Sequence, residues 1–176
     1  SQGLGEMGYG LPGALGAALA CPDRPILCMN CDGGIMMNLQ ELHTIIENNL
    51  PIKIIIFNND GYLMIKHTQK MLFKGNYVSV DKKTGIGLPD FSKLMPAFGY
   101  EYIELKSWED FDNKMKLFID NPKAAVLEVF MDPDQEFIPK VKGMKKQDDT
   151  IVAGLLEEMS PLLPIEDIEY AMISGI

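Results

Sequence analysis

Residues 26–61 decide the fold of this chain and read ILCMNCDGGIMMNLQELHTIIENNLPIKIIIFNNDG. The stretch opens with a short apolar run, 26–30, and a second apolar run, 52–57, is nearly continuous in β-branched residues. A run of the second kind is typical of a strand that is buried on both faces of a parallel sheet. The residues between the two runs leave room for a helix and a return connection. Strand, helix and strand at this spacing predict a right-handed βαβ unit.

The segment 38–49 supplies the helix of this predicted unit. Its apolar residues recur at helical spacing, at Leu39, Leu42, Ile45 and Ile46. Asn38 can cap the first turn, and Glu41 follows three residues later, as in a capping box. We therefore expect one capped, amphipathic helix between the two strands.

The remaining chain continues the alternation of helices and strands. Pro12 suits the first turn of a small-residue helix that runs to residue 20. The further expected elements are a helix over 90–98, a strand over 100–105, a helix over 107–121 capped by Ser107, and a strand over 124–130. The segment 62–90 lacks clear periodicity, which is typical of a lid or a binding region. The predicted fold class is α/β, with a mostly parallel sheet flanked by helices on both faces.

Composition limits the classes of partner and the compartment. At 176 residues the chain is expected to form one domain with a tail. Its net charge of −9 and the lack of a basic stripe argue against a nucleic-acid partner. No apolar run approaches the roughly 18 residues of a membrane span, so we expect neither a membrane segment nor a signal peptide. Three cysteines, an odd number, indicate a reducing compartment, so we expect a cytoplasmic protein.

The two strands of the βαβ unit end in residues that can bind a cation. Asp32 follows the first strand and Asn59 follows the second, so both are expected at the carboxyl edge of the sheet, where ligands of such sheets bind. Mg²⁺ takes six oxygen ligands and usually keeps substrate phosphates among them. Gly61 can offer its carbonyl oxygen, while Gly33 and Gly34 leave their N–H groups free for phosphate. Each turn alone would be ordinary turn chemistry, but their pairing across a βαβ unit predicts a site for Mg²⁺ and a diphosphate.

These residues resemble a known family. The run Asp32-Gly33-Gly34, followed by Asn58-Asn59, is similar to the G-D-G…N-N motif of thiamine diphosphate-dependent enzymes. Other stretches resemble the acetolactate synthase group, namely residues 3–12, 37–42, 49–53, 89–91 and 139–141. The resemblance covers roughly residues 3 to 165. It implies the thiamine diphosphate-binding fold and the diphosphate-binding domain of a 2-keto acid decarboxylase or carboligase.

The resemblance also implies roles for individual residues. The Mg²⁺ ligands would be Asp32, Asn59 and the carbonyl oxygen of Gly61. The aminopyrimidine would contact Gly5, Glu6 and Met7, with Met7 bending the cofactor into a V shape. The diphosphate end would be held by Gly33, Gly34, Asp60, Gly61, Tyr62, Leu63 and Met64.

The resemblance further implies an organisation beyond this chain. We expect residues 1–140 to form the cofactor-binding domain and residues 141–176 a C-terminal arm. The catalytic glutamate that protonates the aminopyrimidine would belong to a separate pyrimidine-binding domain or subunit. Active sites of the family lie between two chains, which implies a homo-oligomer. The chain alone is therefore expected to bind the cofactor poorly and not to turn over.

Two departures from the family pattern keep other activities open. Cys31 stands where the motif has its first glycine, and the tryptophan of the substrate channel falls near Thr68, beside His67. His67 could assist proton transfer because a histidine titrates near neutral pH. The alternatives are a related thiamine diphosphate lyase, a sugar-modifying carboligase, or a non-catalytic cofactor-binding or interaction module.

Two short motifs carry weaker alternatives. Residues 3–8 fit the dinucleotide fingerprint G-x-G-x-x-G, but that fingerprint should follow a strand. Cys28 and Cys31 have the spacing C-x-x-C, but no second pair completes a zinc site. Because side chains alternate along a strand, these two thiols are expected on opposite faces.

Overall fold

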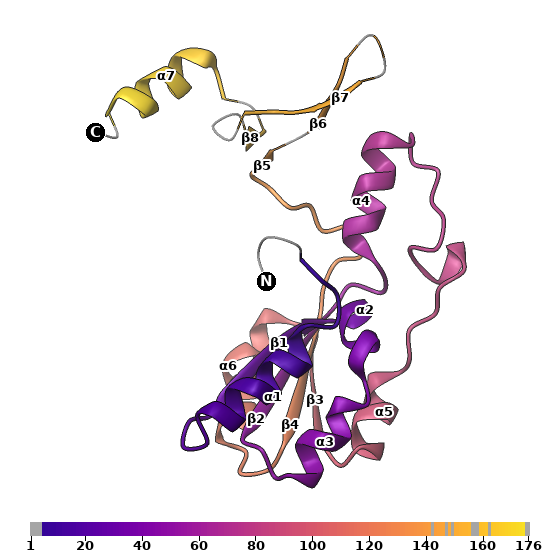
Figure 1. Ribbon diagram of the computed structural model, residues 1–176, viewed down its shortest axis with the longest axis vertical. Coiled ribbons are helices and arrows are strands. Elements are labelled where there is room, and N and C mark those ends of the chain that lie inside the picture. Colours follow the sequence, from indigo (N-terminus) through magenta and orange to yellow (C-terminus); the bar gives the residue numbers. More distant parts are fainter. Residues whose placement is uncertain are drawn as a thin grey trace. The chain divides into compact units, whose positions relative to one another are not determined.

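The computed structural model describes residues 5–141, 143–146, 148, 150–155, 159–161 and 163–174. The chain divides into two compact units, Ser1–Gln135 and Glu136–Ile176 (Figure 1). The first unit contains the βαβ stretch and every residue predicted to bind the cofactor. Within the described residues, no helix has both the length and the apolar character needed to cross a bilayer.

A four-stranded parallel sheet forms the centre of the first unit, in the order β1-β2-β4-β3. The strands are β1 (Ile26–Cys31), β2 (Ile52–Asn58), β3 (Glu101–Leu105) and β4 (Ala125–Phe130). In register, Cys31 pairs with Phe57, and Asn58 pairs with Phe130. The carboxyl ends of β1, β2 and β4 therefore meet at one edge, and the predicted α/β class with a parallel sheet is confirmed.

Helices cover both faces of this sheet (Figure 1). The first face carries α1 (Gly10–Ala20), α3 (Glu41–Glu47) and α5 (Phe91–Ala97). Their fully buried side chains pack against Ile54 and Ile56 of β2, and include Leu11, Leu42, Ile45 and Met95. The second face carries α6 (Phe111–Asp120), whose Phe118 is buried against a cluster that includes Ile55 and Leu127. Ile54, Ile55 and Ile56 are all buried, as the continuous apolar run predicted.

The connection between β1 and β2 differs from the single capped helix that was expected. It contains α2 (Asp32–Ile35), η1 (Met36–Asn38) and α3. The prediction that Asn38 caps the helix is wrong, since its Nδ2 instead donates to the carbonyl oxygen of Gly8 at 2.8 Å. The physical reason is that Gln40, the residue before α3, already has helical backbone angles. The chain enters α3 from a preceding helical turn rather than from an extended cap.

The segment 62–90 is more regular than its sequence suggested. It contains α4 (Leu63–Leu72) and η2 (Lys82–Thr84). Of the residues in α4, only Leu63 is buried, while Met64, Ile65 and Met71 are exposed. Its apolar residues recur at helical spacing, but they do not form one core-facing stripe. The predicted cap at Ser107 is confirmed, because its side chain accepts from the N–H of Glu109 in η3 (Trp108–Asp110). Asp90, for which no cap was predicted, accepts from the N–H of Ser92 before α5.

The second unit is built from short antiparallel pairs and one helix. The strand β5 (Lys140–Val141) pairs with β8 (Met159–Ser160), and β6 (Gly143–Lys145) pairs with β7 (Ile151–Ala153). The helix α7 (Ile165–Ser174) follows. The division after Gln135 lies close to the boundary expected at residue 140.

Candidate functional site

Asp32 joins the ends of two strands. It is the first residue of α2, directly after β1, and its side chain has no solvent exposure. Its Oδ1 accepts a hydrogen bond of 2.8 Å from the N–H of Gly33. Its Oδ2 accepts from the N–H groups of Asn59 and Gly61, both at 3.1 Å. One carboxylate therefore holds the loop that follows β2 against the end of β1.

The electrostatics of this carboxylate favour a cation beside it. Burial raises the pKa of Asp32, and the backbone N–H groups of Gly33, Gly61, Asn59 and Asp60 oppose that shift. Desolvation penalises the charged form, and a nearby positive charge relieves the penalty. Asp32 accepts hydrogen bonds of 2.8–3.1 Å from three of these four N–H groups, and a carboxylate accepts about four in total, so one acceptor position stays available for a cation.

Asn59, whose backbone N–H donates to this carboxylate, also has a buried side-chain oxygen without a hydrogen-bond partner among the described residues. The residue is only 9% exposed. Leaving a buried acceptor unpaired costs about 1–3 kcal/mol, so such atoms usually have a ligand. A neutral amide oxygen and a carboxylate oxygen are donors that Mg²⁺ accepts. The residues present therefore fit a hard cation at this loop.

The other donor types of common metal centres do not gather here. Within the described part of the chain, no group of three or more His, Cys, Asp or Glu side chains could hold a metal ion. Cys28 is buried and Cys31 is exposed, as expected for alternate positions of a strand, and both are free thiols. Burial raises the pKa of Cys28 to about 11. This pattern agrees with core packing for Cys28 rather than a zinc site.

Two glycines allow the loop to close tightly. Gly61 has φ +155°, and a Cβ at this position would lie 2.2 Å from the carbonyl oxygen of Val80. A Cβ on Gly33 would lie 2.4 Å from Cε1 of Tyr62. The backbone and the Tyr62 ring thus approach to distances that only glycine permits. Asp60, between Asn59 and Gly61, has a left-handed φ of +60°.

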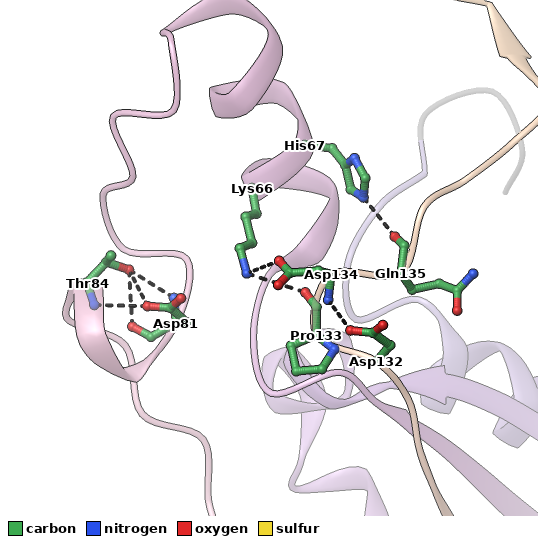
Figure 2. Close-up of polar contacts among 8 residues, drawn as sticks. All are labelled: Lys66, His67, Asp81, Thr84, Asp132, Pro133, Asp134 and Gln135. Atoms are coloured by element: carbon green, nitrogen blue, oxygen red, sulfur yellow. Dashed lines mark hydrogen bonds and ion pairs between the residues drawn. The ribbon is translucent and has the colours of Figure 1, made fainter. Parts of the chain in front are cut away.

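A cavity of about 540 Å³ opens beside the loop. Its lining residues come from three segments and are Asn59, Asp60, Gly61, Tyr62, Leu63, Lys66, Val80, Asp81, Lys82, Lys83, Pro133 and Asp134. Asp81 caps η2 through the N–H and the hydroxyl of Thr84 (Figure 2). This fixes the wall of the cavity opposite to α4.

Lys66 is a feature of this cavity that was not predicted from the sequence. Its Nζ lies 2.6 Å from Oδ1 of Asp134 and 3.4 Å from the carbonyl oxygen of Pro133 (Figure 2). The hydrogen bond to Asp134 raises the pKa of Lys66, and the Lys66 side chain is only 18% exposed. A basic residue one turn into the helix after the amide-rich loop is the signal that could have identified it.

The structure places the remaining predicted residues as follows. His67 lies on α4 with its Nε2 2.9 Å from the carbonyl oxygen of Gln135 (Figure 2). Leu63 is buried and lines the cavity, whereas Met64 is 64% exposed. Gly34 is half-buried beside Asn30. The catalytic role of His67 and the cofactor contacts of Met64 and Gly34 stay predictions.

The residues expected at the aminopyrimidine lie before α1. Gly5, Glu6 and Met7 are exposed, and Gly5 has a left-handed φ of +63°. Gly8 anchors this segment, because its carbonyl oxygen accepts from Asn38. The contacts of the three exposed residues with an aminopyrimidine stay predictions.

A family comparison agrees with the geometry of the loop. The family described as "Thiamine pyrophosphate enzyme, C-terminal TPP binding domain" matches residues 1–129. The chain belongs to this family. Thiamine pyrophosphate (TPP) is thiamine diphosphate, so the predicted family and cofactor are confirmed. The glycine-rich residues 3–8 fall within the match, which accounts for them without a dinucleotide fingerprint.

Within the TPP family, the chain is similar to acetolactate synthases. The chain is 40% identical over 141 residues to the acetolactate synthase isozyme 1 large subunit of Escherichia coli (strain K12), covering 80% of this chain and 25% of that protein. It is 34% identical over 151 residues to the mitochondrial acetolactate synthase catalytic subunit of Saccharomyces cerevisiae, covering 86% and 21%. The chain therefore spans about a quarter of the length of these relatives.

A solved structure shows the same fold. The thiamine diphosphate-dependent 4-hydroxybenzoylformate decarboxylase of Rhodococcus jostii RHA1 is 30% identical with a TM-score of 0.64. The similarity covers 74% of this chain and 24% of that protein. The fold and the family thus identify a TPP-binding domain that is similar to part of the acetolactate synthases and of this decarboxylase.

Proposed function

We propose that this domain binds TPP together with Mg²⁺ and serves an enzyme that decarboxylates 2-keto acids and ligates the product. The proposal is carried by Asn59, whose N–H donates to the carboxylate of Asp32 and whose Oδ1 is buried without a hydrogen-bond partner among the described residues. Asp32 follows β1 and Asn59 follows β2, and the N–H groups of Asn59 and Gly61 donate hydrogen bonds to the Asp32 carboxylate. Asp32, Asn59 and the carbonyl of Gly61 would hold the cation, and the cation would hold the diphosphate.

The chain's own residues position the cofactor and exclude water. Gly33 lets the Tyr62 ring pack onto the start of α2, which closes the junction beside Asp32. Lys66 places a positive charge at the cavity, although Asp134 pairs with it. When bound, TPP would supply a carbanionic thiazolium carbon as the nucleophile and the cationic ring as the acceptor of the electron pair released on decarboxylation. The protein's contribution is position and electrostatics.

The relatives support a 2-keto acid as the substrate class. Two are acetolactate synthases by name, and the solved structure is a decarboxylase of 4-hydroxybenzoylformate, itself a 2-keto acid. The stretch that differs from the family's substrate channel contains His67 and Thr68. The relatives therefore support a 2-keto acid in general, but not a particular size of its side chain. We infer pyruvate as the first substrate to test.

The proposed enzyme needs more than this domain. The relatives are about four times longer, which supports a further domain or subunit that carries the acid for the aminopyrimidine. We propose that the assembled enzyme is a cytoplasmic homo-oligomer with its sites between chains.

The cofactor part of the proposal is tested by ³¹P NMR titration of TPP, which detects weak binding. Wild-type protein should shift and broaden the diphosphate signals with Mg²⁺ and not with EDTA. Asp32→Ala should abolish the Mg²⁺-dependent effect, while Asp112→Ala, an exposed acid on α6, should retain it. Binding that is equal with EDTA, or unchanged in Asp32→Ala, contradicts the proposal.

The substrate class needs an independent assay. The domain is co-expressed with a pyrimidine-binding domain, and carbon dioxide release from pyruvate and other 2-keto acids is measured. Release that requires both domains and TPP supports the enzyme. Failure to release carbon dioxide from any 2-keto acid would favour the non-catalytic cofactor-binding module.

A further inference from the structure

A buried carboxylate lies behind the cation loop without being one of the proposed ligands. Glu128 is on β4, next to Ile56 of β2 in register, and is 2% exposed. Its Oε1 accepts a hydrogen bond of 2.5 Å from Nδ2 of Asn58. Its Oε2 accepts from the hydroxyl of Tyr102 on β3. A buried carboxylate is costly unless it is hydrogen-bonded, so this placement calls for a reason.

Asn58 transmits this contact to the loop. While its Nδ2 donates to Glu128, its Oδ1 accepts from the N–H of Asp60 at 2.8 Å. Asp60 has a left-handed φ of +60°, a conformation that few residues other than Gly, Asn and Asp adopt. The bond from Asp60 to Asn58 therefore helps to hold this turn between Asn59 and Gly61.

The orientation of the Asn58 amide depends on Glu128. An amide can turn over at little cost when both of its ends meet similar partners. Here one end faces an N–H donor and the other end faces a carboxylate acceptor. A reversed amide would place its NH₂ group against the N–H of Asp60 and its oxygen against Glu128, which gives two mismatched contacts.

The loop is thus held by two carboxylates from opposite sides. Asp32, after β1, binds the N–H groups of Asn59 and Gly61 directly. Glu128, on β4, acts on Asp60 through Asn58. Only the first of the two is a candidate cation ligand.

We propose that Glu128 is a positioning residue that sets, through Asn58, the loop conformation in which Asn59 and Gly61 meet the cation. Tyr102 completes the arrangement by holding the second oxygen of Glu128. The inference rests on the proposed Mg²⁺ site, since it assigns to Glu128 the orientation of that site's ligands. Residues that orient metal ligands in this way typically change metal affinity about 10–100-fold when they are mutated.

The test exchanges donor and acceptor across the Asn58–Glu128 pair. Asn58→Asp brings an acceptor against Oε1 of Glu128 and should weaken Mn²⁺ binding in the presence of TPP by about 10–100-fold. Adding Glu128→Gln supplies a donor in place of that oxygen while leaving the other oxygen for Tyr102. The double variant keeps the acceptor for Asp60 and should restore most of the lost affinity.

Glu128→Gln alone should have a small effect. A glutamine can present its oxygen to Asn58 if the Tyr102 hydroxyl rotates to accept from its NH₂ group. The matched control is Glu104→Gln, the same change on the neighbouring strand at the residue in register with Glu128. Glu104 pairs with Lys106 instead, so its variant should bind Mn²⁺ like wild type.

Two measurements show whether the Glu128–Asn58 contact positions the metal ligands or only stabilises the fold. Mn²⁺ affinity is measured by electron paramagnetic resonance on folded protein, and the thermal midpoint is measured without metal. A purely structural contact would lower the midpoint and leave the affinity of folded molecules unchanged, which overturns the inference. If Asn58→Asp does not fold, Glu128→Asp replaces it, because it withdraws the carboxylate by one methylene without placing two acceptors together.

The outcomes also separate this inference from the proposed function. Wild-type protein that binds no Mn²⁺ with TPP overturns both. Wild-type binding with equal affinity in Asn58→Asp, or without recovery in the double variant, overturns the inference alone.

Discussion

Oδ1 of Asn59 is expected to bind the cation but to reduce the stability of the fold when no cation is bound. This atom is buried without a partner among the described residues, so it lowers the stability of the metal-free fold. Replacing an unsatisfied polar group by an apolar one of similar shape is neutral or stabilising. We therefore expect Asn59→Leu to leave the free energy of unfolding in EDTA unchanged or raised, as measured by urea denaturation.

The same substitution should abolish Mg²⁺-dependent TPP binding. Asn59→Asp is the matched control, because it keeps an oxygen at the site and should retain the cation. A marked loss of stability in Asn59→Leu would show that Oδ1 has a structural partner, contrary to this account.

Gly61 is required by backbone geometry rather than by chemistry. Gly61→Ala places a Cβ 2.2 Å from the Val80 carbonyl oxygen, a backbone atom that cannot turn away. We expect a loss of about 1–3 kcal/mol, the usual cost of overpacking. Gly16→Ala in α1 meets open space and should instead stabilise by about 0.5–1 kcal/mol. Urea denaturation measures both, and equal effects of the two changes would contradict the close approach at Gly61.

At the scale of elements, the strands β1, β2 and β4 were predicted because short apolar runs between turn residues are typical of strands, and their order in the chain implied a parallel sheet. The central strands β2 and β4 are mostly buried, whereas β1 lies at the edge of the sheet and buries only Cys28. Asp32 and Asn59 were found because the ends of such strands meet. Asn38 was misassigned because it is the last residue of η1, which follows α2, and nothing in the local pattern shows that the Asp-Gly-Gly turn is itself helical.

Other parts of the site depend on contacts between distant segments. α4 was not predicted, although Met64, Ile65, Met71 and Leu72 recur at helical spacing. It buries only Leu63, so this apolar side of the helix does not belong to the core. Lys66 gains its role from Asp134, and Glu128 gains its role from Asn58 and Tyr102. A glutamate within an apolar strand is a visible anomaly, but its partners lie on two other strands. Only the folded sheet identifies them.

The attachment of α4 gives a prediction at this scale. Few buried contacts make a helix prone to local opening. Asp134→Ala removes the ion pair with Lys66, so the amides of α4 should exchange with solvent faster in hydrogen-exchange measurements. Asp120→Ala, which breaks the exposed pair with Lys116 on α6, should leave α4 unchanged. Unaltered exchange of α4 in Asp134→Ala would refute the attachment.

The stabilisation of α4 by the Lys66–Asp134 ion pair should weaken as the pH falls. The hydrogen bond from Lys66 lowers the pKa of Asp134 in the folded state. A carboxylate with a lowered folded pKa stabilises above its unfolded pKa, and that contribution disappears as the pH falls through the lowered value. Exchange of α4 in wild type should therefore approach that of Asp134→Ala in acid.

At the scale of the molecule, the cofactor function belongs to the first unit. That unit ends at Gln135 and contains the whole family match, 1–129. A chain cut after Gln135 should unfold cooperatively and retain Mg²⁺-dependent TPP binding, as measured by thermal denaturation and ³¹P NMR. A chain cut after Met131 loses Asp134 and Gln135, the partners of Lys66 and His67, and should lose affinity. If the chain cut after Gln135 does not bind TPP, residues 136–176 must contribute to the binding site.

The central claim is that Asp32 and Asn59 hold a divalent cation at the diphosphate of TPP. Its most direct test is a crystal structure of the domain with TPP and Mn²⁺, in which the metal is located by its anomalous signal. The account predicts one peak within bonding distance of an Asp32 carboxylate oxygen, Oδ1 of Asn59 and the carbonyl oxygen of Gly61, with diphosphate oxygens completing the shell. Bound TPP with the peak elsewhere, or with Oδ1 of Asn59 turned away from it, would contradict the account.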